Sequence, residues 1–376
     1  MKLFEPIKFA GLESKNRIMF PPMVSRRATM DNFVTQDTKD LYMGLAKGGA
    51  GIVVVELTYI LPSMPLLLAI YDDAHAQGFK EMLDDIHKES DALMFIQLGD
   101  AIPGLTNTEE IQPEMIEMFI GAFINAAVNS KKAGFDGIEI HAAHGYMVSA
   151  FLSLRNKRKD EYGKNLDGRM LLLKRLIEGC RQACGKDYPI SVRINGEEFI
   201  VGGNTLNQTT KIAPRLADMG IAYLSISAGG KMQDAWNVID TQLKFPYPKP
   251  GPWANVEGYS GHRCVPPSYM ADCCNVFLAE AIKESLVESG HADLPVITAG
   301  KIRTADQAEK VLQAGKADII GLCRPIMCDH EWPKKVQEGR FNEIRKCAYC
   351  NYCMESARLA NPNTTCIKWK KEGIVN

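Results

Sequence analysis

Four cysteines near the end of the chain have a spacing that suits metal binding. Cys347, Cys350, Cys353 and Cys366 follow the pattern Cys-x2-Cys-x2-Cys-x12-Cys in a chain of 376 residues. Three thiolates on a short loop, joined by a fourth nearby, can hold zinc or an iron–sulfur cluster, since cysteine sulfur binds both. A cluster would make single-electron transfer part of the function. The alternatives are a structural zinc site, or thiols that pack as small hydrophobic side chains.

A second reactive group is formed by His141, His144 and Tyr146, which lie close together in the sequence. Two imidazoles three residues apart can bind a metal, or can donate hydrogen bonds jointly to one oxygen atom. A tyrosine phenol has a pKa near 10 and stays protonated at neutral pH, so it can give a proton to an enolate-like carbanion. We interpret the three residues as a functional set rather than as structural side chains.

Short apolar runs must position these side chains. Eight such runs alternate with amphipathic, helix-like stretches, and several are apolar at consecutive positions, which is typical of parallel strands covered on both faces. The runs are Arg17–Pro21, Gly51–Leu57, Leu93–Leu98, Gly137–His141, Ile190–Ile194, Tyr223–Ser227, Pro295–Thr298 and Ile319–Leu322. Eight strand–helix repeats predict an α/β fold, a (β/α)8 TIM barrel. The alternative is an open doubly wound sheet, but no G-x-G-x-x-G motif opens a helix.

The pattern predicts a barrel over residues 1–340 and a Cys-rich segment over 341–376 that packs on it. A long Pro-, Gly- and aromatic-rich insertion, about 229–268, follows the sixth strand. We expect it to cover or line a site, because long loops without secondary structure usually have a function. The alternative is a surface excursion. His262 within it could act as an additional acid, although a solvated loop histidine is the commoner case.

Functional side chains of a barrel gather at the carboxyl ends of its strands. Gln97 and Arg193 are polar residues near such ends, and buried polar groups need partners, so we expect a polar ligand in the barrel mouth. The loops after the seventh and eighth strands usually cradle a phosphate, and Lys301 and Arg324 could add charge there. Alternatively, Arg324 pairs with a carboxylate such as Asp318.

Composition excludes several classes of protein. Lys and Arg total 44 against 45 Asp and Glu, so neither nucleic acid nor a membrane surface is expected as a partner. No apolar run reaches the length of a membrane span and no secretory signal is visible. The remaining cysteines do not form a secreted disulfide framework. We therefore expect a cytoplasmic protein, assembled as a homo-oligomer, with a small-molecule substrate.

The sequence resembles the Old Yellow Enzyme family of flavin-dependent ene reductases over almost its whole length. The matching segments are LFEPIKFAGLESKNRIMFPPM, DGIEIHAAHGYMVSAFLSLRNKRKDEYG and ADIIGLCRP. The cysteine tail is similar to that of the subgroup that contains 2,4-dienoyl-CoA reductase and trimethylamine dehydrogenase, whose barrel carries a [4Fe-4S] cluster. The resemblance therefore implies a cluster rather than zinc.

The resemblance also implies FMN across the barrel mouth and assigns roles to matching residues. His141 and His144 would bind the carbonyl oxygen of an α,β-unsaturated substrate, FMN would deliver hydride to its β-carbon, and Tyr146 would protonate its α-carbon. The residues implied in FMN binding are Pro22, Met23, Val24 and Leu57 along the ring system, Gln97 and Arg193 at its polar edge, and Gly300, Lys301, Cys323 and Arg324 at the phosphate. Arg193 would stabilise the negative charge of reduced flavin.

Four features depart from the family pattern. Val24 replaces a residue that is often Thr or Cys, and Cys323 replaces a smaller residue. The third cluster cysteine, Cys353, comes one residue early. The chain also stops ten residues after Cys366, before the domains that feed electrons to the cluster in larger members. We therefore expect electrons to come from a separate donor protein, or from NAD(P)H bound directly over the flavin.

Two other functions stay open. One is oxidation of an amine, as by an amine dehydrogenase or demethylase, for which an aromatic bowl is usual. The residues that could form such a bowl are Trp236, Tyr247, Trp253 and Tyr259. The other is a non-catalytic FMN and iron–sulfur electron-transfer subunit. The set of two histidines and a tyrosine favours ene reduction over both.

Overall fold

The computed structural model describes residues 1–100, 108–230, 258–355 and 363–372. Eight parallel strands close into a barrel in the order β10-β3-β4-β5-β6-β7-β8-β9. The strands are β3 (Ile18–Phe20), β4 (Ile52–Tyr59), β5 (Leu93–Gly99), β6 (Gly137–Ala142), β7 (Ile190–Asn195), β8 (Leu224–Ser227), β9 (Val296–Ala299) and β10 (Ile319–Gly321). The predicted barrel and its eight strands are thus confirmed, and the open-sheet alternative is wrong.

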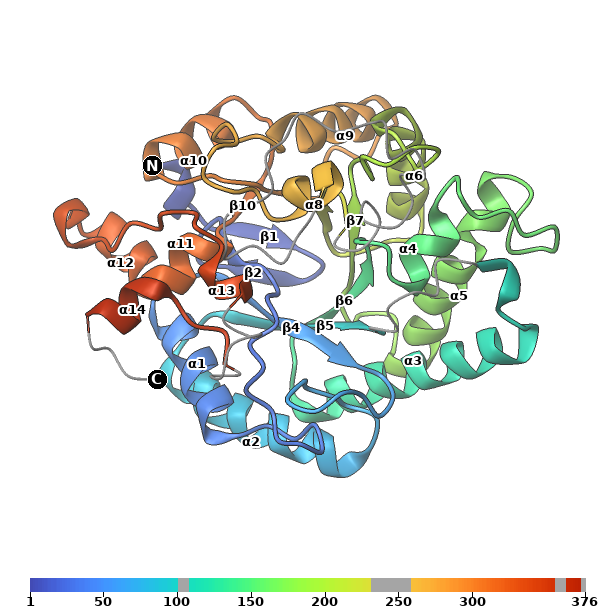
Figure 1. The fold of residues 1–376 in the computed structure, drawn as a ribbon, viewed down its shortest axis with the longest axis horizontal. Coiled ribbons are helices and arrows are strands. Elements are labelled where there is room, and N and C mark those ends of the chain that lie inside the picture. Colours follow the sequence, from blue (N-terminus) through green and yellow to red (C-terminus); the bar gives the residue numbers. More distant parts are fainter. Residues whose placement is uncertain (101–107, 231–257, 356–362, 373–376) are drawn as a thin grey trace.

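Helices surround the barrel (Figure 1). The main ones are α1 (Gln36–Lys47), α2 (Asp73–Glu89), α3 (Pro113–Ala133), α5 (Leu166–Cys184), α6 (Leu206–Asp218), α9 (Val276–Glu288) and α10 (Ala305–Gln313). Shorter helical elements are η1 (Lys2–Phe4), η2 (Thr108–Glu110), α4 (Met147–Leu152), α8 (Gly258–Cys264), α11 (Cys323–Cys328), α12 (Trp332–Gln337), η3 (Phe341–Glu343), α13 (Tyr352–Glu355) and α14 (Ile367–Lys371). Among the described residues, none of these helices is both long and apolar enough to cross a membrane.

Local sequence signals explain where several helices begin and end. The predicted capping box of α10 is present, because Thr304 accepts from the backbone of Gln307 and the Gln307 side chain accepts from the backbone of Thr304. Helix α3 begins with Pro113 and ends at Gly134, whose φ of 97° is unfavourable for other residues. All eight residues of β4 are buried, as expected for a parallel strand covered on both faces.

An N-terminal hairpin closes the bottom of the barrel. Strands β1 (Ile7–Phe9) and β2 (Leu12–Ser14) pair antiparallel. Phe9 of this hairpin packs against Phe95 and Tyr223, with ring centroids 6.5 and 6.0 Å apart, and both lie at or near the start of their strands. Because the amino ends of the strands are closed in this way, the carboxyl ends remain for a binding site.

Candidate functional site

The carboxyl ends of the strands surround one open cavity. The cavity and its mouth contain about 1090 Å³ of space free of protein atoms. All thirteen residues that were predicted to bind FMN or substrate line it: Pro22, Met23, Val24, Leu57, Gln97, His141, His144, Tyr146, Arg193, Gly300, Lys301, Cys323 and Arg324. The structure therefore brings the predicted set together from positions up to 302 residues apart in the chain (22 to 324), while their individual roles remain predictions.

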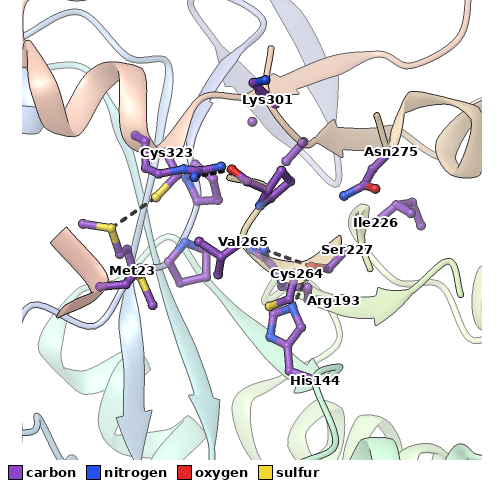
Figure 2. Close-up of a pocket in the computed structure, with 18 of the residues that line it drawn as sticks. Met23, His144, Arg193, Ile226, Ser227, Cys264, Val265, Asn275, Lys301 and Cys323 are labelled. Atoms are coloured by element: carbon purple, nitrogen blue, oxygen red, sulfur yellow. Dashed lines mark hydrogen bonds between the residues drawn. The ribbon is translucent and has the colours of Figure 1, made fainter. Parts of the chain in front are cut away.

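A hydrogen-bonded series links the two histidines to Arg193. His144 Nδ1 lies 3.3 Å from His141 Nε2, and His144 Nε2 lies 2.6 Å from Ser227 Oγ. Arg193 donates from Nη2 to the same Ser227 oxygen at 3.4 Å. Figure 2 shows His144, Arg193 and Ser227 grouped on one side of the cavity, away from Met23 and Cys323. A backbone bridge between His144 and Gly230 holds the loop that carries His144 in place. His144 adopts a φ of 63° in this loop.

The side chain of Arg193 is the feature of the cavity that best fits the binding of an anionic or carbonyl-bearing ligand. Its side chain is 9% exposed, and its Nε and Nη1 atoms have no hydrogen-bond partner within the described structure. Buried guanidinium N–H groups without acceptors are costly, so a ligand acceptor in the cavity would satisfy them. FMN, whose ring system carries carbonyl oxygens and gains negative charge on reduction, has the chemistry that this group requires.

Below Arg193 lies a buried carboxylate, Glu139. It accepts from Gln97 Nε2 at 2.8 Å and from Tyr223 OH at 3.1 Å. Burial raises the pKa of Glu139, and the positive charge of Arg193 opposes that rise. Gln97 is thus held at the floor of the cavity by a partner that the sequence did not reveal.

Tyr146 lies beside His141, with ring centroids 4.9 Å apart. Burial is the main cause that raises the pKa of Tyr146 well above 10, and the neighbouring Tyr59, Cys264 and Asp100 add to it. The phenol therefore stays protonated across the physiological range, as a proton donor must.

The loops after β9 and β10, where the sequence predicts a phosphate site, line one side of the cavity. Gly300 adopts a φ of 126°, and a Cβ built on it would lie 2.8 Å from the Asn275 Cβ, so only glycine fits. The ammonium of Lys301 is engaged by the carbonyls of Ser268 and Met270. Any contribution of Lys301 to a phosphate would then come from its backbone rather than from its side chain.

Arg324 lines the same side of the cavity. It donates from Nη1 to Pro266 O at 2.7 Å and to Asn351 Oδ1 at 2.5 Å. The alternative pairing with Asp318 is wrong, because Asp318 forms an ion pair with Lys283 and accepts from the backbone of Val296.

Several lining residues were not predicted. They are Ser227 at the end of β8, Cys264 at the end of α8, Val265 and Pro266 after that helix, Asn275, and Tyr349 and Met354 from the Cys-rich segment. Ser227 had a usable signal, since it is a polar residue at the end of a predicted strand. The others come from short helices (Cys264 in α8 and Met354 in α13) and from irregular segments, whose positions follow from tertiary packing.

The described end of the predicted insertion lines the cavity through Cys264, Val265 and Pro266. Residues 231–257, with Trp236, Tyr247 and Trp253, lie outside the described part, as does the side chain of Tyr259. His262 is not a solvated loop residue, because it is 2% exposed and its Nδ1 lies 2.7 Å from Tyr269 OH. His262 is not among the residues that line the cavity.

The four predicted cluster cysteines, Cys347, Cys350, Cys353 and Cys366, line a second, smaller cavity. A fifth cysteine, Cys328 at the end of α11, also lines it and was not predicted. None of these five cysteines forms a disulfide within the described structure. A hydrogen bond from the Cys328 thiol lowers the pKa of Cys366 to about 6, which favours the thiolate form that binds metals.

The thiol donors thus suit an iron–sulfur cluster, but they are not gathered into a formed ligand shell. Within the described ranges, no three His, Cys, Asp or Glu side chains are arranged to hold a metal ion.

Comparisons with known proteins agree with this site. The family model described as "NADH:flavin oxidoreductase / NADH oxidase family" matches residues 2–110, 102–238 and 267–343. The chain is 35% identical to an NADH oxidase of Thermoanaerobacter brockii, over 93% of this chain and 52% of that protein. It is 28% identical to a cinnamate reductase of Clostridium sporogenes, over 99% of this chain and 59% of that protein.

A solved structure of a 2-naphthoyl-CoA reductase in complex with 2-naphthoyl-CoA has the same fold. It superposes with a TM-score of 0.78 at 27% identity and covers 94% of this chain and 55% of its own. The chain thus spans about half the length of the relatives named here. The resemblance inferred from the sequence is confirmed.

Proposed function

Because the chain belongs to the NADH:flavin oxidoreductase / NADH oxidase family, we propose that it is an FMN-dependent reductase of an activated C=C bond. The substrate would be an α,β-unsaturated carbonyl compound, an enoate or an enoyl thioester. The observation that carries the proposal is the placement of His141, His144 and Tyr146 around one cavity with Arg193, whose Nε and Nη1 atoms have no hydrogen-bond partner within the described structure. The names of the cinnamate and 2-naphthoyl-CoA reductases support the same class of reaction.

Bound FMN would supply the hydride that is added to the β-carbon of the substrate. Pro22, Met23 and Leu57 offer apolar surface to its ring system, and Arg193 offers N–H donors to its polar edge. A fixed cation at that edge stabilises the negative charge of the reduced ring.

The histidines would bind the substrate carbonyl. His144 Nδ1 and His141 Nε2 lie 3.3 Å apart, and a bound substrate oxygen would replace this contact with hydrogen bonds from both rings. Such hydrogen bonds withdraw electrons from the conjugated system and make the β-carbon more electrophilic. Ser227 keeps the ring of His144 oriented.

Tyr146 would donate its phenolic proton to the α-carbon, where negative charge develops after hydride addition. Its raised pKa means that the proton is present before the reaction, and its place beside His141 puts it next to the carbonyl site. The phenolate that forms would be reprotonated from solvent before the next turnover.

The source of electrons is a separate part of the proposal. NADH or NADPH could reduce the flavin directly, or a donor protein could do so through a [4Fe-4S] cluster at the four cysteines. The thiol-lined cavity next to the flavin site supports the second route. Stopped-flow reduction of the isolated chain by NADH and by NADPH distinguishes the two routes.

A Tyr146→Phe variant tests the mechanism. We expect reduction of the alkene to slow by about 10²- to 10⁴-fold, the usual contribution of a positioned general acid, while flavin reduction by NAD(P)H changes little. The two half-reactions are measured separately by stopped-flow absorbance of the flavin. Tyr71→Phe serves as the control, because Tyr71 packs against the nearby cluster of Leu57 and Tyr59 and is not among the lining residues. Equal rates of alkene reduction by Tyr146→Phe and wild type would refute the role of Tyr146 as the proton donor.

A further inference from the structure

Arg324 borders two cavities: the open cavity at the carboxyl ends of the strands, called here the flavin cavity, and the smaller cavity lined by the cysteines, called the cysteine cavity. Its side chain is 9% exposed, so its orientation is set by protein contacts rather than by solvent. It is also one of the residues to which the resemblance of the sequence to the Old Yellow Enzyme family assigns the flavin phosphate. Whatever fixes the position of Arg324 therefore affects both sites.

Residues 347–353, which contain the first three cysteines, form the cysteine loop. Two residues of this loop hold the guanidinium of Arg324 in place. Asn351 accepts from Arg324 Nη1 at 2.5 Å, and the Tyr349 ring lies under the guanidinium at 4.5 Å from its centroid. Both residues are almost fully buried, with 3% and 2% exposure. A charged donor that is bonded and stacked in this way has little rotational freedom left.

The same two residues are anchored to the walls of the flavin cavity. Asn351 donates from Nδ2 to Val265 O at 3.1 Å, and Tyr349 donates from its hydroxyl to Ile302 O at 3.0 Å. Val265, Ile302 and Tyr349 all line the flavin cavity. The loop between the cysteines is therefore part of the wall on the phosphate side.

The spacing in the sequence ties these contacts to metal binding. Tyr349 lies between Cys347 and Cys350, and Asn351 lies between Cys350 and Cys353. Both adopt positive φ values, 55° and 60°, which residues other than glycine rarely adopt unless the surrounding structure imposes them. A metal group that holds the three cysteines would restrict the conformations open to this loop, and its loss would widen them.

A second connection lies on the other side of the cavity. Thr364, two residues before Cys366, donates from its hydroxyl to Val24 O at 2.9 Å and from its backbone to Ser25 O at 2.8 Å. Val24 lines the flavin cavity. Both stretches that carry the cysteines are thus bonded to the flavin site.

We propose that Tyr349 and Asn351 are positioning residues for Arg324, so that metal loading at the cysteines strengthens FMN binding. The inference rests on the proposed function, because it takes FMN as the ligand of the first cavity. When metal is bound at the cysteines, the loop holds Arg324 in the orientation that binds the phosphate. When metal is absent, FMN itself must order the guanidinium. The negative charge of a cluster would oppose the binding of the FMN phosphate. The opposition acts through Arg324, whose guanidinium already donates a hydrogen bond to Asn351.

The test is FMN affinity of the full chain with and without metal. Flavin-free protein is titrated with FMN, and the quenching of flavin fluorescence gives the Kd, once after anaerobic reconstitution with iron and sulfide and once after stripping with a chelator. We expect the stripped protein to bind FMN about tenfold more weakly, the lower end of what one charge-assisted hydrogen bond contributes. By linkage, saturating FMN should also raise the iron retained at a fixed chelator concentration.

Variants separate positioning from folding. In loaded protein, Asn351→Ala should bind FMN about tenfold more weakly at an unchanged iron content, and Asn342→Ala, an exposed residue of η3, should not. If Asn351→Ala does not fold, Tyr349→Phe tests the same inference, since it keeps the ring under Arg324 and loses only the bond to Ile302 O. We expect about threefold weaker FMN binding for that variant.

The outcomes are distinct. Equal FMN affinity of loaded and stripped protein, or tighter binding by the stripped protein, overturns the inference and leaves the proposed function intact. Wild-type affinity in both Asn351→Ala and Tyr349→Phe also overturns it. Failure of the wild-type chain to bind FMN in either state instead refutes the proposed function.

Discussion

Glu198 makes the stability of this protein depend on pH in a way that can be worked out from the structure. It follows β7, is 5% exposed, and accepts from Ser153 Oγ at 2.8 Å and from the backbone of Asn204 at 3.0 Å. Its own carbonyl accepts from Ser260 Oγ at 2.6 Å, just before the segment that lines the cavity. Burial raises the pKa of Glu198 from 4.5 to about 7, despite the hydrogen bonds that lower it.

The sign and size of the effect follow from proton linkage. The folded protein binds this proton more tightly than the unfolded chain does, so protonation stabilises the fold. That contribution is complete below about pH 4.5 and is lost as the pH rises to about 7. Each tenfold change in proton affinity corresponds to about 1.4 kcal/mol, so the loss amounts to about 3 kcal/mol.

Glu198→Gln removes this proton and keeps the oxygen that accepts both hydrogen bonds. We compare the decrease in the free energy of unfolding between pH 4.5 and pH 8 in the two proteins. We expect this decrease to be about 3 kcal/mol smaller in the variant than in wild type. The measurement is urea unfolding of the flavin-free chain, followed by circular dichroism at several pH values. Glu56 and Asp100 are also buried with a pKa raised to about 7, but both remain in the two proteins and cancel in the comparison.

The control is Glu81→Gln, which changes an exposed carboxylate whose pKa is lowered by a hydrogen bond from Lys39. It should leave the decline in stability between pH 4.5 and pH 8 close to that of wild type. The reasoning is refuted if Glu198→Gln loses as much stability with rising pH as wild type does.

Two further predictions concern the flavin site. Arg193→Gln should lower the two-electron reduction potential of bound FMN by about 30–60 mV, the equivalent of one lost charge-assisted hydrogen bond; a dye-equilibration titration measures it, and an unchanged or higher potential contradicts the role of Arg193. Gly300→Ala should destabilise the protein by about 1–3 kcal/mol, because its Cβ would lie 2.8 Å from that of Asn275 in a backbone conformation unfavourable for alanine. Urea unfolding checks this, and wild-type stability would show that the loop adapts without strain.

Residues on the strand ends could be placed from the sequence because the barrel itself orders them. Once eight strands are recognised, the carboxyl end of each must face one cavity, and Gln97, His141 and Arg193 follow from that rule. Ser227, at the end of β8, obeys the same rule.

Other features could not be read from the sequence because they depend on packing between distant segments. Tyr349 reaches the flavin cavity from the Cys-rich segment, and the Lys301 ammonium is engaged by two carbonyls that lie 33 and 31 residues away in the sequence. Cys328 joins the cysteine cavity from the end of α11, outside the spacing pattern of the other four. No local periodicity or motif encodes such contacts.

Reoxidation of the reduced flavin by an activated alkene is the most direct measurement of the proposed function. The FMN-loaded chain is reduced anaerobically with one equivalent of dithionite per flavin and mixed with an enone, an enoate or an enoyl thioester. We predict that at least one of them reoxidises the flavin and yields one saturated product per flavin. A flavin that stays reduced with all three, yet is reoxidised promptly by an artificial electron acceptor, would contradict the proposed function.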